Sequence, residues 1–283
     1  MSLMRLTAFF LWLMAFAAQP AAAAASPNLW SLEQQLSSLV AGKSADVGIA
    51  ALDLSSGETI SINGDRAFPM ASTMKVAVAA AYLQQVDYGR RSLDTLIAGQ
   101  PAQQLMERML IHSDNAATDI LIRNLGGPQA IQGWVSWHGF SNMRVDRTIA
   151  QLLRSPRDLW DSRDSATPMA MVQLLQRIDS GKVLKPGSKA YLLSTMSRCM
   201  TGKNRMRALL PAGTRVEHKT GTLSGLTSDV GFITLPDGRR IAVALFARGG
   251  SDRPNTIAQA ARAIYDGFVA ELRAPFSGVL RAQ

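Results

Sequence analysis

The stretch Ser72-Thr73-Met74-Lys75 stands at the head of a long apolar run from Val76 to Leu83. Its serine and lysine are separated by nearly one helical turn, so a helix here would place both side chains on one face. At a helix N-terminus, free N–H groups and the helix dipole favour negative charge developing at the serine. A lysine whose pKa is lowered by burial can accept the serine proton. The alternative is an N-cap serine beside a solvated lysine, because Ser-x-x-Lys also occurs by chance.

Two further polar motifs follow along the chain. Ser113-Asp114-Asn115 precedes a predicted helix, and Lys219-Thr220-Gly221 lies within a predicted strand. A serine, an asparagine amide and a lysine can supply a proton relay, paired hydrogen bonds and positive potential, which acyl transfer to a nucleophilic serine requires. For Asp114, a structural role as a buried hydrogen-bond partner is favoured over a role as a catalytic acid.

Residues 1–25 have the pattern of a secretory signal peptide. Arg5 is the only charged residue there, an apolar stretch from Leu6 to Ala18 follows, and an alanine run ends at Ala25. The apolar stretch is short for a membrane span. We therefore expect 26–283 to be an exported catalytic domain, periplasmic or extracellular, without a stable membrane anchor. An uncleaved N-terminal anchor is the alternative.

Composition limits the classes of partner and cofactor. A chain of 283 residues with 47% hydrophobic residues suits one domain, or two closely packed parts. The net charge of +9 is spread without a basic run, so no nucleic-acid partner is expected. The three histidines lack metal-ligand spacing, and neither a metal nor a cofactor is expected.

Cys199, the only cysteine, is predicted to be a small buried hydrophobe, and Trp134 and Trp137 are predicted core residues. A monomer is expected.

Apolar periodicity predicts strands at the two chain ends and helices between them. Strands are predicted over 46–53, 57–62, 215–221, 228–235 and 240–247. Helices are predicted over 28–42, 72–89, 101–110, 116–124, 129–138, 168–179, 187–200 and 255–272, with 141–167 irregular. The predicted fold class is α/β, with an antiparallel sheet built from both chain ends, about 26–68 and 213–283, and a helical subdomain, about 69–212, inserted between them.

The three motifs, in this order, resemble those of the class A β-lactamases, which share them with penicillin-binding proteins. Arg144-Val145-Asp146-Arg147 resembles the start of that family's Ω-loop, and Thr167-Pro168 resembles its end. Arg147 and Asp164 would close the neck of this loop. The resemblance covers essentially the whole chain after residue 25, and it implies a fold of the serine β-lactamase/DD-peptidase type.

The resemblance also implies a role for each motif residue. The implied catalytic residues are Ser72, Lys75, Ser113, Asn115 and Lys219. Ser72 would be the nucleophile and Lys75 a candidate proton acceptor, while the backbone N–H groups of Ser72 and Thr222 would form an oxyanion hole. The residues expected to bind substrate are Thr220, Gly221, Thr222 and Arg253. Arg248 is the alternative to Arg253, because Thr227 stands where many members of the family carry an arginine.

The chain departs from the family at the group that releases the acyl-enzyme. Class A β-lactamases carry a glutamate two residues after the neck arginine, and it activates the hydrolytic water. Here that position is Ile149, which cannot accept a proton, and no glutamate lies between Glu107 and Glu217. Asp158 or Asp161 could substitute from a shifted position, because the loop is longer than in most members of the family.

Two enzymatic functions therefore remain open. The first is a serine hydrolase that opens the β-lactam amide through an acyl-enzyme on Ser72, with slow deacylation as the consequence of the missing glutamate. The second is a penicillin-binding D-alanyl-D-alanine peptidase that acts on cell-wall peptides. The expected partner is accordingly a small-molecule β-lactam or a cell-wall peptide. Membership of the family favours the first function, and the intact motif residues argue against a non-enzymatic ligand-binding protein.

Overall fold

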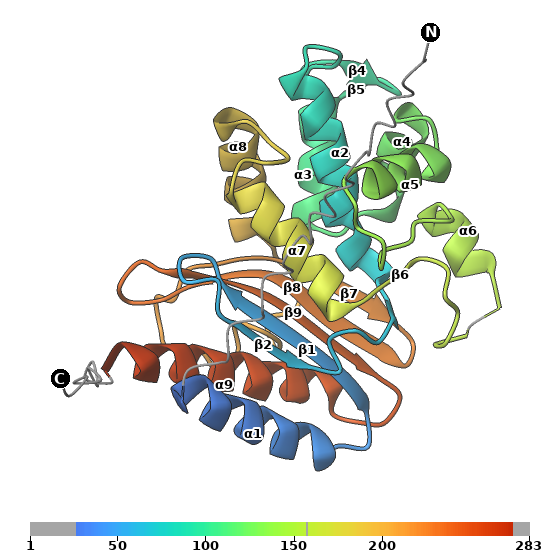
Figure 1. Ribbon diagram of the computed structural model, residues 1–283. Helices are drawn as coiled ribbons and strands as arrows, with labels where there is room; N and C mark the ends of the chain where they lie inside the picture. The colour runs from blue at the N-terminus through green and yellow to red at the C-terminus, as the bar shows by residue number, and fades with distance from the viewer. Residues whose placement is uncertain (1–26, 157, 274–283) are drawn as a thin grey trace, which may run out of the picture.

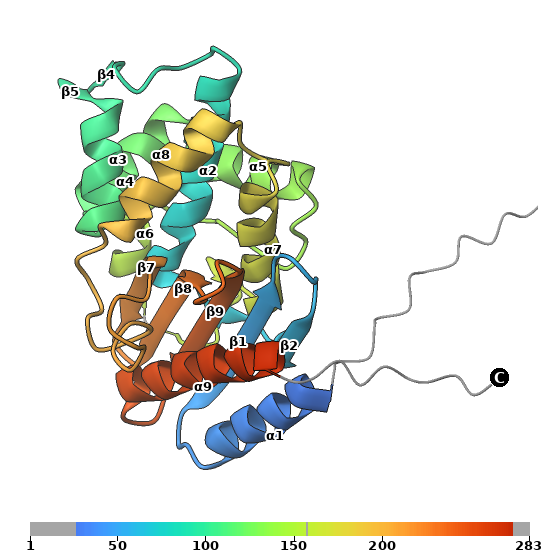
Figure 2. The same ribbon diagram turned by 90° about the vertical axis from the view of Figure 1, so that its left-hand side faces the viewer.

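The computed structural model describes residues 27–156 and 158–273, and the predicted signal peptide lies outside these residues (Figure 1). One antiparallel sheet separates two groups of helices. Two long helices cover one face of the sheet, and the remaining helices stand on the other face (Figures 1 and 2). Among the described residues, no helix is both long and apolar enough to cross a membrane.

The sheet confirms the predicted fold class, because its strands come from both ends of the chain. Its strands are β1 (Asp46–Asp53), β2 (Thr59–Ile62), β7 (Val216–Leu223), β8 (Leu226–Thr234) and β9 (Arg240–Arg248). They lie side by side in the order β2-β1-β9-β8-β7, with every neighbouring pair antiparallel. The minor strands form two short pairs, β3 (Phe68–Pro69) with β6 (Ser165–Ala166) and β4 (Leu96–Ile97) with β5 (Gln100–Pro101). Strand β7 is therefore an edge strand of the main sheet.

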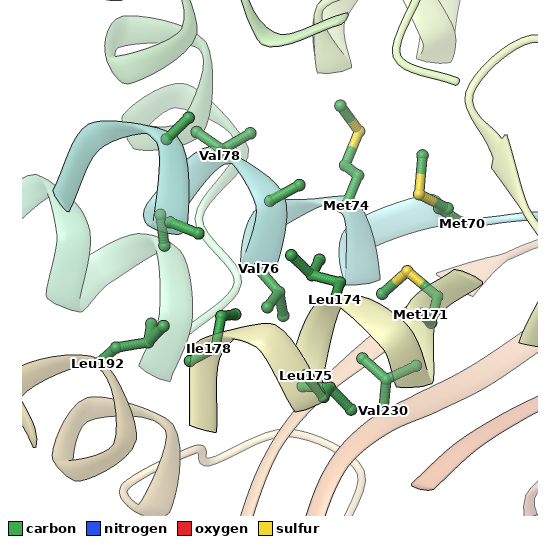
Figure 3. Close-up of a cluster of buried hydrophobic side chains, with 14 of the residues drawn as sticks. Met70, Met74, Val76, Val78, Met171, Leu174, Leu175, Ile178, Leu192 and Val230 are labelled. Atoms are coloured by element: carbon green, nitrogen blue, oxygen red, sulfur yellow. The ribbon is translucent and has the colours of Figure 1, made fainter. Parts of the chain in front are cut away.

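The two faces of the sheet bury two separate hydrophobic cores. Along β9, Ala244 and Phe246 pack toward the larger group of helices, whereas Val243 and Leu245 pack toward the helix pair. Side chains alternate between faces along a strand, and both faces are covered, so β9 is apolar at nearly every position. Figure 3 shows part of the larger core, where side chains of α2 and α7 lie together above Val230 of β8.

The helices divide between the two faces. The pair on one face is α1 (Pro27–Ala41) and α9 (Arg253–Arg273). The other face carries the 3₁₀ turn η1 (Ala71–Met74), α2 (Lys75–Asp87), α3 (Ala102–Ile111), α4 (Asn115–Asn124), α5 (Pro128–Trp137), α6 (Ile149–Arg154), α7 (Pro168–Asp179) and α8 (Pro186–Ser197). Helix α2 is buried along most of its length, so it forms the centre of this helical group. Thr167 is the N-cap of α7, with its hydroxyl accepting from Ala170 N at 3.1 Å.

Two predictions about this region were wrong. Residues 141–167 are not wholly irregular, because they contain α6 and β6. A capping box between Thr148 and Gln151 stabilises the start of α6, and a six-residue helix is too short to show an apolar stripe. Trp137 is 71% exposed, whereas Trp134 is buried as predicted. The Trp137 ring lies edge-on to His138 at the surface instead of entering the core.

Candidate active site

The three motifs meet beside the edge strand β7. Ser72 lies in η1, and Lys75 is the first residue of α2. Ser113 lies between α3 and α4, and Asn115 is the first residue of α4. Lys219 lies on β7. Lys75 Nζ donates to Ser113 O at 2.7 Å, to Asn115 Oδ1 at 2.9 Å and to Ser113 Oγ at 3.2 Å. Lys219 Nζ donates to the same Ser113 Oγ at 3.0 Å. The Ser113 hydroxyl therefore stands between two lysine amines.

The backbone around the two serines adopts uncommon conformations. Ser72 lies in the 3₁₀ turn that leads into α2, not in the first turn of the α-helix itself. The preceding Ala71 has φ +50°, and Ser113 has φ +59°, which place two non-glycine residues in the left-handed region. Such conformations persist only where the surrounding structure enforces them, and they cluster at functional sites. Ser72 Oγ makes no hydrogen bond to any residue that the structure describes.

Burial changes the protonation of both lysines. Desolvation, and then the positive charge of Lys219, lower the pKa of Lys75 to about 7. Desolvation likewise lowers the pKa of Lys219 to about 8, against the opposing influence of Cys199 and Asp229. Near neutral pH, Lys75 therefore exists partly as the free amine that can accept a proton, while most of Lys219 stays charged.

Gly221 explains how β7 approaches the serine segment so closely. A Cβ atom added at this position would lie 2.6 Å from Met70 O, and it would also overlap the Ser228 hydroxyl. Real Cβ atoms do not approach a carbonyl oxygen so closely, and the glycine therefore allows β7 to pack directly against the chain that leads into Ser72. The predicted substrate-binding residue Gly221 thus has a packing reason of its own.

The two predicted threonines are already hydrogen-bonded. Thr220 Oγ1 lies 2.5 Å from Thr201 Oγ1, so this hydroxyl is paired with the segment that follows α8. Thr222 is exposed, and its Oγ1 accepts from Arg205 Nη2 at 2.7 Å. Arg205 Nη1 also donates to Gly221 O at 2.9 Å. Arg205 therefore places a cation beside Thr222, a contact that the sequence did not predict because the segment carrying Arg205 has no periodic pattern.

The two arginines considered as substrate ligands are hydrogen-bonded to residues outside the three motifs. Arg253 donates from Nη1 to Gly249 O at 2.9 Å and to Gly250 O at 2.5 Å, which ties the start of α9 to the preceding turn. Arg248 donates to Asp46 Oδ2 at 2.8 Å and stacks 3.5 Å from the centre of the Trp160 ring. In the described part of the chain, neither arginine hydrogen-bonds to a motif residue.

An ion pair closes the loop that resembles the family's Ω-loop. Arg147 Nε donates to Asp164 Oδ2 at 2.5 Å, and both side chains are nearly buried. The other oxygen of Asp164 accepts the backbone N–H groups of Asp146 and Arg147 at 2.8 and 3.0 Å. The predicted pairing of Arg147 with Asp164 is therefore present.

Ile149 sits at the first position of α6, with its side chain 3% exposed within the larger core. The start of α6 is held by Asp119 of α4, whose carboxylate accepts Ile149 N at 2.7 Å and Ala150 N at 2.9 Å. Asp119 was not among the predicted site residues. Its separation of four residues from Asn115 does indicate that both lie on one face of α4, directed toward the site.

The two aspartates considered as substitutes for the glutamate have structural partners. Asp161 accepts from Arg163 and forms an ion pair with Arg147 at 3.1 Å. The hydrogen bonds from Arg163 hold the pKa of Asp161 at about 2. Asp158 Oδ1 accepts the backbone N–H of Trp160 at 2.8 Å, a contact typical of an Asx turn. Both carboxylates therefore stabilise the loop itself.

Asp114 has the predicted role of a hydrogen-bond partner, but its side chain is half-buried and not buried as predicted. Its Oδ1 accepts Ala117 N at 2.9 Å as the N-cap of α4, and its Oδ2 forms an ion pair with Arg108.

Within the described residues, no group of histidine, cysteine, aspartate and glutamate side chains could hold a metal ion.

The chain is similar to known β-lactamases in sequence and in structure. It is 33% identical to the extended-spectrum β-lactamase PER-1 of Pseudomonas aeruginosa, with 83% of this chain and 86% of that relative covered. It is 29% identical to the carbapenem-hydrolysing β-lactamase KPC of Klebsiella oxytoca, over 78% of this chain and 84% of the relative. A solved β-lactamase structure from Chitinophaga pinensis superposes with a TM-score of 0.79 at 30% identity, covering 84% of this chain and 99% of that one.

A family model shows the same relationship. The model described as the β-lactamase enzyme family matches residues 31–268, which include all three motifs and every strand of the main sheet. The resemblance inferred from the motifs is thereby confirmed. The chain belongs to the class A β-lactamase family.

Proposed function

We propose that the chain opens the β-lactam amide through an acyl-enzyme on Ser72. The single observation that carries this proposal is that Lys75 and Lys219 both donate to the Ser113 hydroxyl, while Lys75 follows the turn that contains Ser72. The relatives are β-lactamases by name, which favours this reaction over the peptidase alternative. The proposed substrate is accordingly a small-molecule β-lactam.

Acylation would use the two lysines in different protonation states. Neutral Lys75 accepts the Ser72 proton as the Ser72 oxygen attacks the lactam carbonyl carbon. The carbonyl C–N bond then breaks, and the leaving nitrogen takes the hydroxyl proton of Ser113, which Lys75 replaces. Charged Lys219 donates to Ser113 Oγ, and its positive potential lowers the cost of negative charge at this hydroxyl.

Substrate anions would bind along the edge of β7. The close approach of Gly221 to Met70 supports an oxyanion hole formed by the N–H groups of Ser72 and Thr222. We propose that Thr220 and Thr222 face the ligand carboxylate. Arg205 donates to Thr222 Oγ1 and supplies positive charge near the ligand carboxylate. The contacts of Arg253, which donates to Gly249 O, do not support this role for Arg253.

We propose that deacylation is slow. Both nearby carboxylates already hold the loop between Arg147 and Asp164. Asp119 accepts backbone N–H groups at the start of α6, and Asp161 forms an ion pair with Arg147. Ile149 has no proton-accepting group. Lys75 is then the nearest base to the acyl-enzyme, and it must serve both steps.

We further propose that the enzyme acts after export and removal of residues 1–25, and that it acts as a monomer. The support for export is the pattern of residues 1–25, and the first described helix already packs into the core through Leu29 and Leu32. The support for a monomer is that every proposed catalytic group comes from one chain.

Intact-mass spectrometry with a penicillin tests the proposal. The wild-type protein should gain the mass of the whole penicillin, because ring opening expels no fragment, and the adduct should persist for minutes to hours. Ser72→Ala should gain no mass. Ser251→Ala, a substitution of an exposed serine, is the matched control and should acylate normally. Absence of an adduct together with absence of hydrolysed penicillin would overturn the proposal.

A further inference from the structure

The loop from Arg147 to Asp164 is attached to the sheet at a second point, away from its neck. Arg248, the last residue of β9, is 5% exposed, and its Nη1 donates to Ala67 O at 2.9 Å and to Leu159 O at 3.2 Å. Its guanidinium carbon also lies 3.5 Å from the centre of the Trp160 ring. A buried arginine thus contacts the backbone of one loop residue and the side chain of the next.

The Trp160 ring lies over this arginine at the surface of the protein. The ring is 65% exposed, so burial in a core does not explain its position. A cation over the face of a tryptophan ring is attracted by the ring, and the attraction is stronger when the cation is desolvated, as the guanidinium of Arg248 is here. The cation–π contact therefore fixes the position of Trp160 and of its neighbour Leu159.

Leu159 extends this attachment to the edge of the sheet that carries the site. Strands β7 and β8 are joined by a turn of two residues, Ser224 and Gly225. A Cβ atom added at Gly225 would lie 2.7 Å from Leu159 Cδ1, so the leucine side chain packs directly on this turn. Leu159 and Leu223 also line one narrow cleft of about 40 Å³ between the loop and the end of β7.

The same turn is held from the side of the sheet. Arg248 lies opposite Leu226 in the register of β8 and β9, and Gly249 N donates to Gly225 O at 2.8 Å. The turn is thus held between the backbone that follows β9 and the side chain of Leu159. Among the described strands, β7 pairs with β8 alone, so contacts at this turn contribute to the position of its end.

We propose that Leu159 is a positioning residue for the end of β7, and that Arg248 and Trp160 fix Leu159 in place. The inference rests on the proposed function, because the group to be positioned is the Thr222 N–H of the proposed oxyanion hole, just before the turn. An oxyanion-hole donor must lie close to the developing charge, and a shift of about 1 Å can cost about a hundredfold in rate.

This attachment is separate from the neck of the loop. The neck is closed by Arg147 and Asp164, and Arg248 hydrogen-bonds to neither of them in the described part of the chain. Loss of the neck ion pair should therefore leave Leu159 packed on the turn, whereas loss of the Trp160 ring should release it. By its contacts, Leu159 belongs with β7 and not with the neck.

The first test measures the turn directly and does not depend on acylation. Hydrogen exchange with mass spectrometry follows the amides of residues 222–226 and of Gly249. Trp160→Leu keeps an apolar side chain without the aromatic face, and it should speed this exchange by about tenfold, as expected for loss of a desolvated cation–π contact. Trp160→Tyr keeps the aromatic face and should exchange like wild type. Trp137→Leu, at another exposed tryptophan, is the matched control.

The second test separates positioning from substrate binding. Stopped-flow measurement with a chromogenic β-lactam gives the acylation rate at saturation and the half-saturating concentration. Leu159→Ala and Trp160→Leu should lower the saturating rate by about tenfold and change the half-saturating concentration by less than about threefold. Trp160→Tyr should restore the rate. Arg248 is left in place because it also donates to Asp46 of β1.

The outcomes distinguish this inference from the proposed function. Unchanged exchange in Trp160→Leu, an equal loss of rate in Trp160→Tyr, or a change confined to the half-saturating concentration contradicts the inference. Absence of any adduct on wild type contradicts the proposed function instead, and hydrogen exchange then still decides whether Leu159 holds the turn.

Discussion

The catalytic cluster and the loop from Arg147 to Asp164 use their polar side chains in opposite ways. Around Ser113, the lysine amines are buried and bonded to groups that the reaction itself would use. In the loop, Asp164 accepts hydrogen bonds from Arg147 and from backbone N–H groups, so its carboxylate stabilises the shape of the loop. The first region holds the groups that we propose form the acyl-enzyme. The second retains the frame of an Ω-loop, but the position of the catalytic carboxylate carries a core side chain.

This difference shows that loop shape and loop chemistry are separable. The ion pair of Arg147 with Asp164 and the contact of Asp119 with the start of α6 do not involve the side chain of residue 149. The loop therefore keeps its ion pair and the start of α6 with an isoleucine at position 149. The two halves of the reaction then depend on different regions, and substitutions can test each region alone.

The largest expected effect concerns the cluster. Lys75→Met removes the proton acceptor and leaves Ser113 and Asn115 without their shared donor, so the acylation rate should fall by about 10³–10⁴-fold. Stopped-flow measurement with a chromogenic β-lactam gives this rate. Lys203→Met, at an exposed position, is the control and should be unchanged. Loss of less than tenfold would show that Lys75 is not the base.

The frame of the loop can be broken without touching the cluster. Asp164→Asn leaves Arg147 without its closest counter-charge, and the free energy of unfolding should fall by about 3 kcal/mol. Asparagine tolerates the left-handed conformation of this residue, φ +51°, so backbone strain is not the cause. Urea denaturation measures the effect, with Asp158→Asn as the control. Acylation should stay within about threefold of wild type, and a larger loss would mean that the two regions are coupled.

The missing chemistry can be returned to the loop. Ile149→Glu should speed deacylation by about 10²-fold, because a positioned general base is restored. Ile149→Gln has similar shape without the base and should not accelerate release of the adduct. Both variants place a polar group where Ile149 is buried, so both should lower Tm. Decay of the adduct by mass spectrometry separates the two, and equal decay rates would show that residue 149 does not face the acyl-enzyme.

The smallest effect is on pH dependence. Lys75, with its pKa near 7, acts as a base only when neutral, so acylation should decline as pH falls below 7. Lys219, with its pKa near 8, must be charged, so acylation should decline as pH rises above 8. The profile should be bell-shaped, with about a tenfold loss one unit beyond each value. Lys219→Arg keeps its charge and should remove the basic limb, and persistence of that limb would assign it to another group.

The sequence was most informative where side chains repeat or where motifs carry chemistry. Apolar strands such as β9 and the Thr167-Pro168 start of α7 were predicted because local patterns specify them. The order of the motifs and the family resemblance predicted that Lys75, Ser113 and Lys219 belong to one site, and the structure adds the contact between Lys75 and Ser113. Arg205 and Asp119 were missed because their roles arise from contacts with Thr222 and with the start of α6, which only the folded chain creates.

The exposed and irregular parts were less predictable for the same reason. The helix α6 is stabilised by a side-chain cap and by a carboxylate from another helix, not by its own apolar pattern. Trp137 has a hydrophobic side chain, but it is the last residue of α5 and lies on the exposed side of that helix. Composition indicates which residues favour burial, but the orientation of the helix decides which of them reach the core.

The pairing of β1 with β9 has a consequence for how the enzyme matures. Asp46 and Arg248 lie side by side in the sheet, although 202 residues separate them along the chain. Contacts between such distant segments close late and make folding slow, because a large loop must be ordered first. Lys219 also belongs to the last third of the chain, while Ser72 belongs to the first. A chain still emerging from a ribosome therefore lacks both its sheet and the complete set of groups proposed for acylation until β7, β8 and β9 have followed.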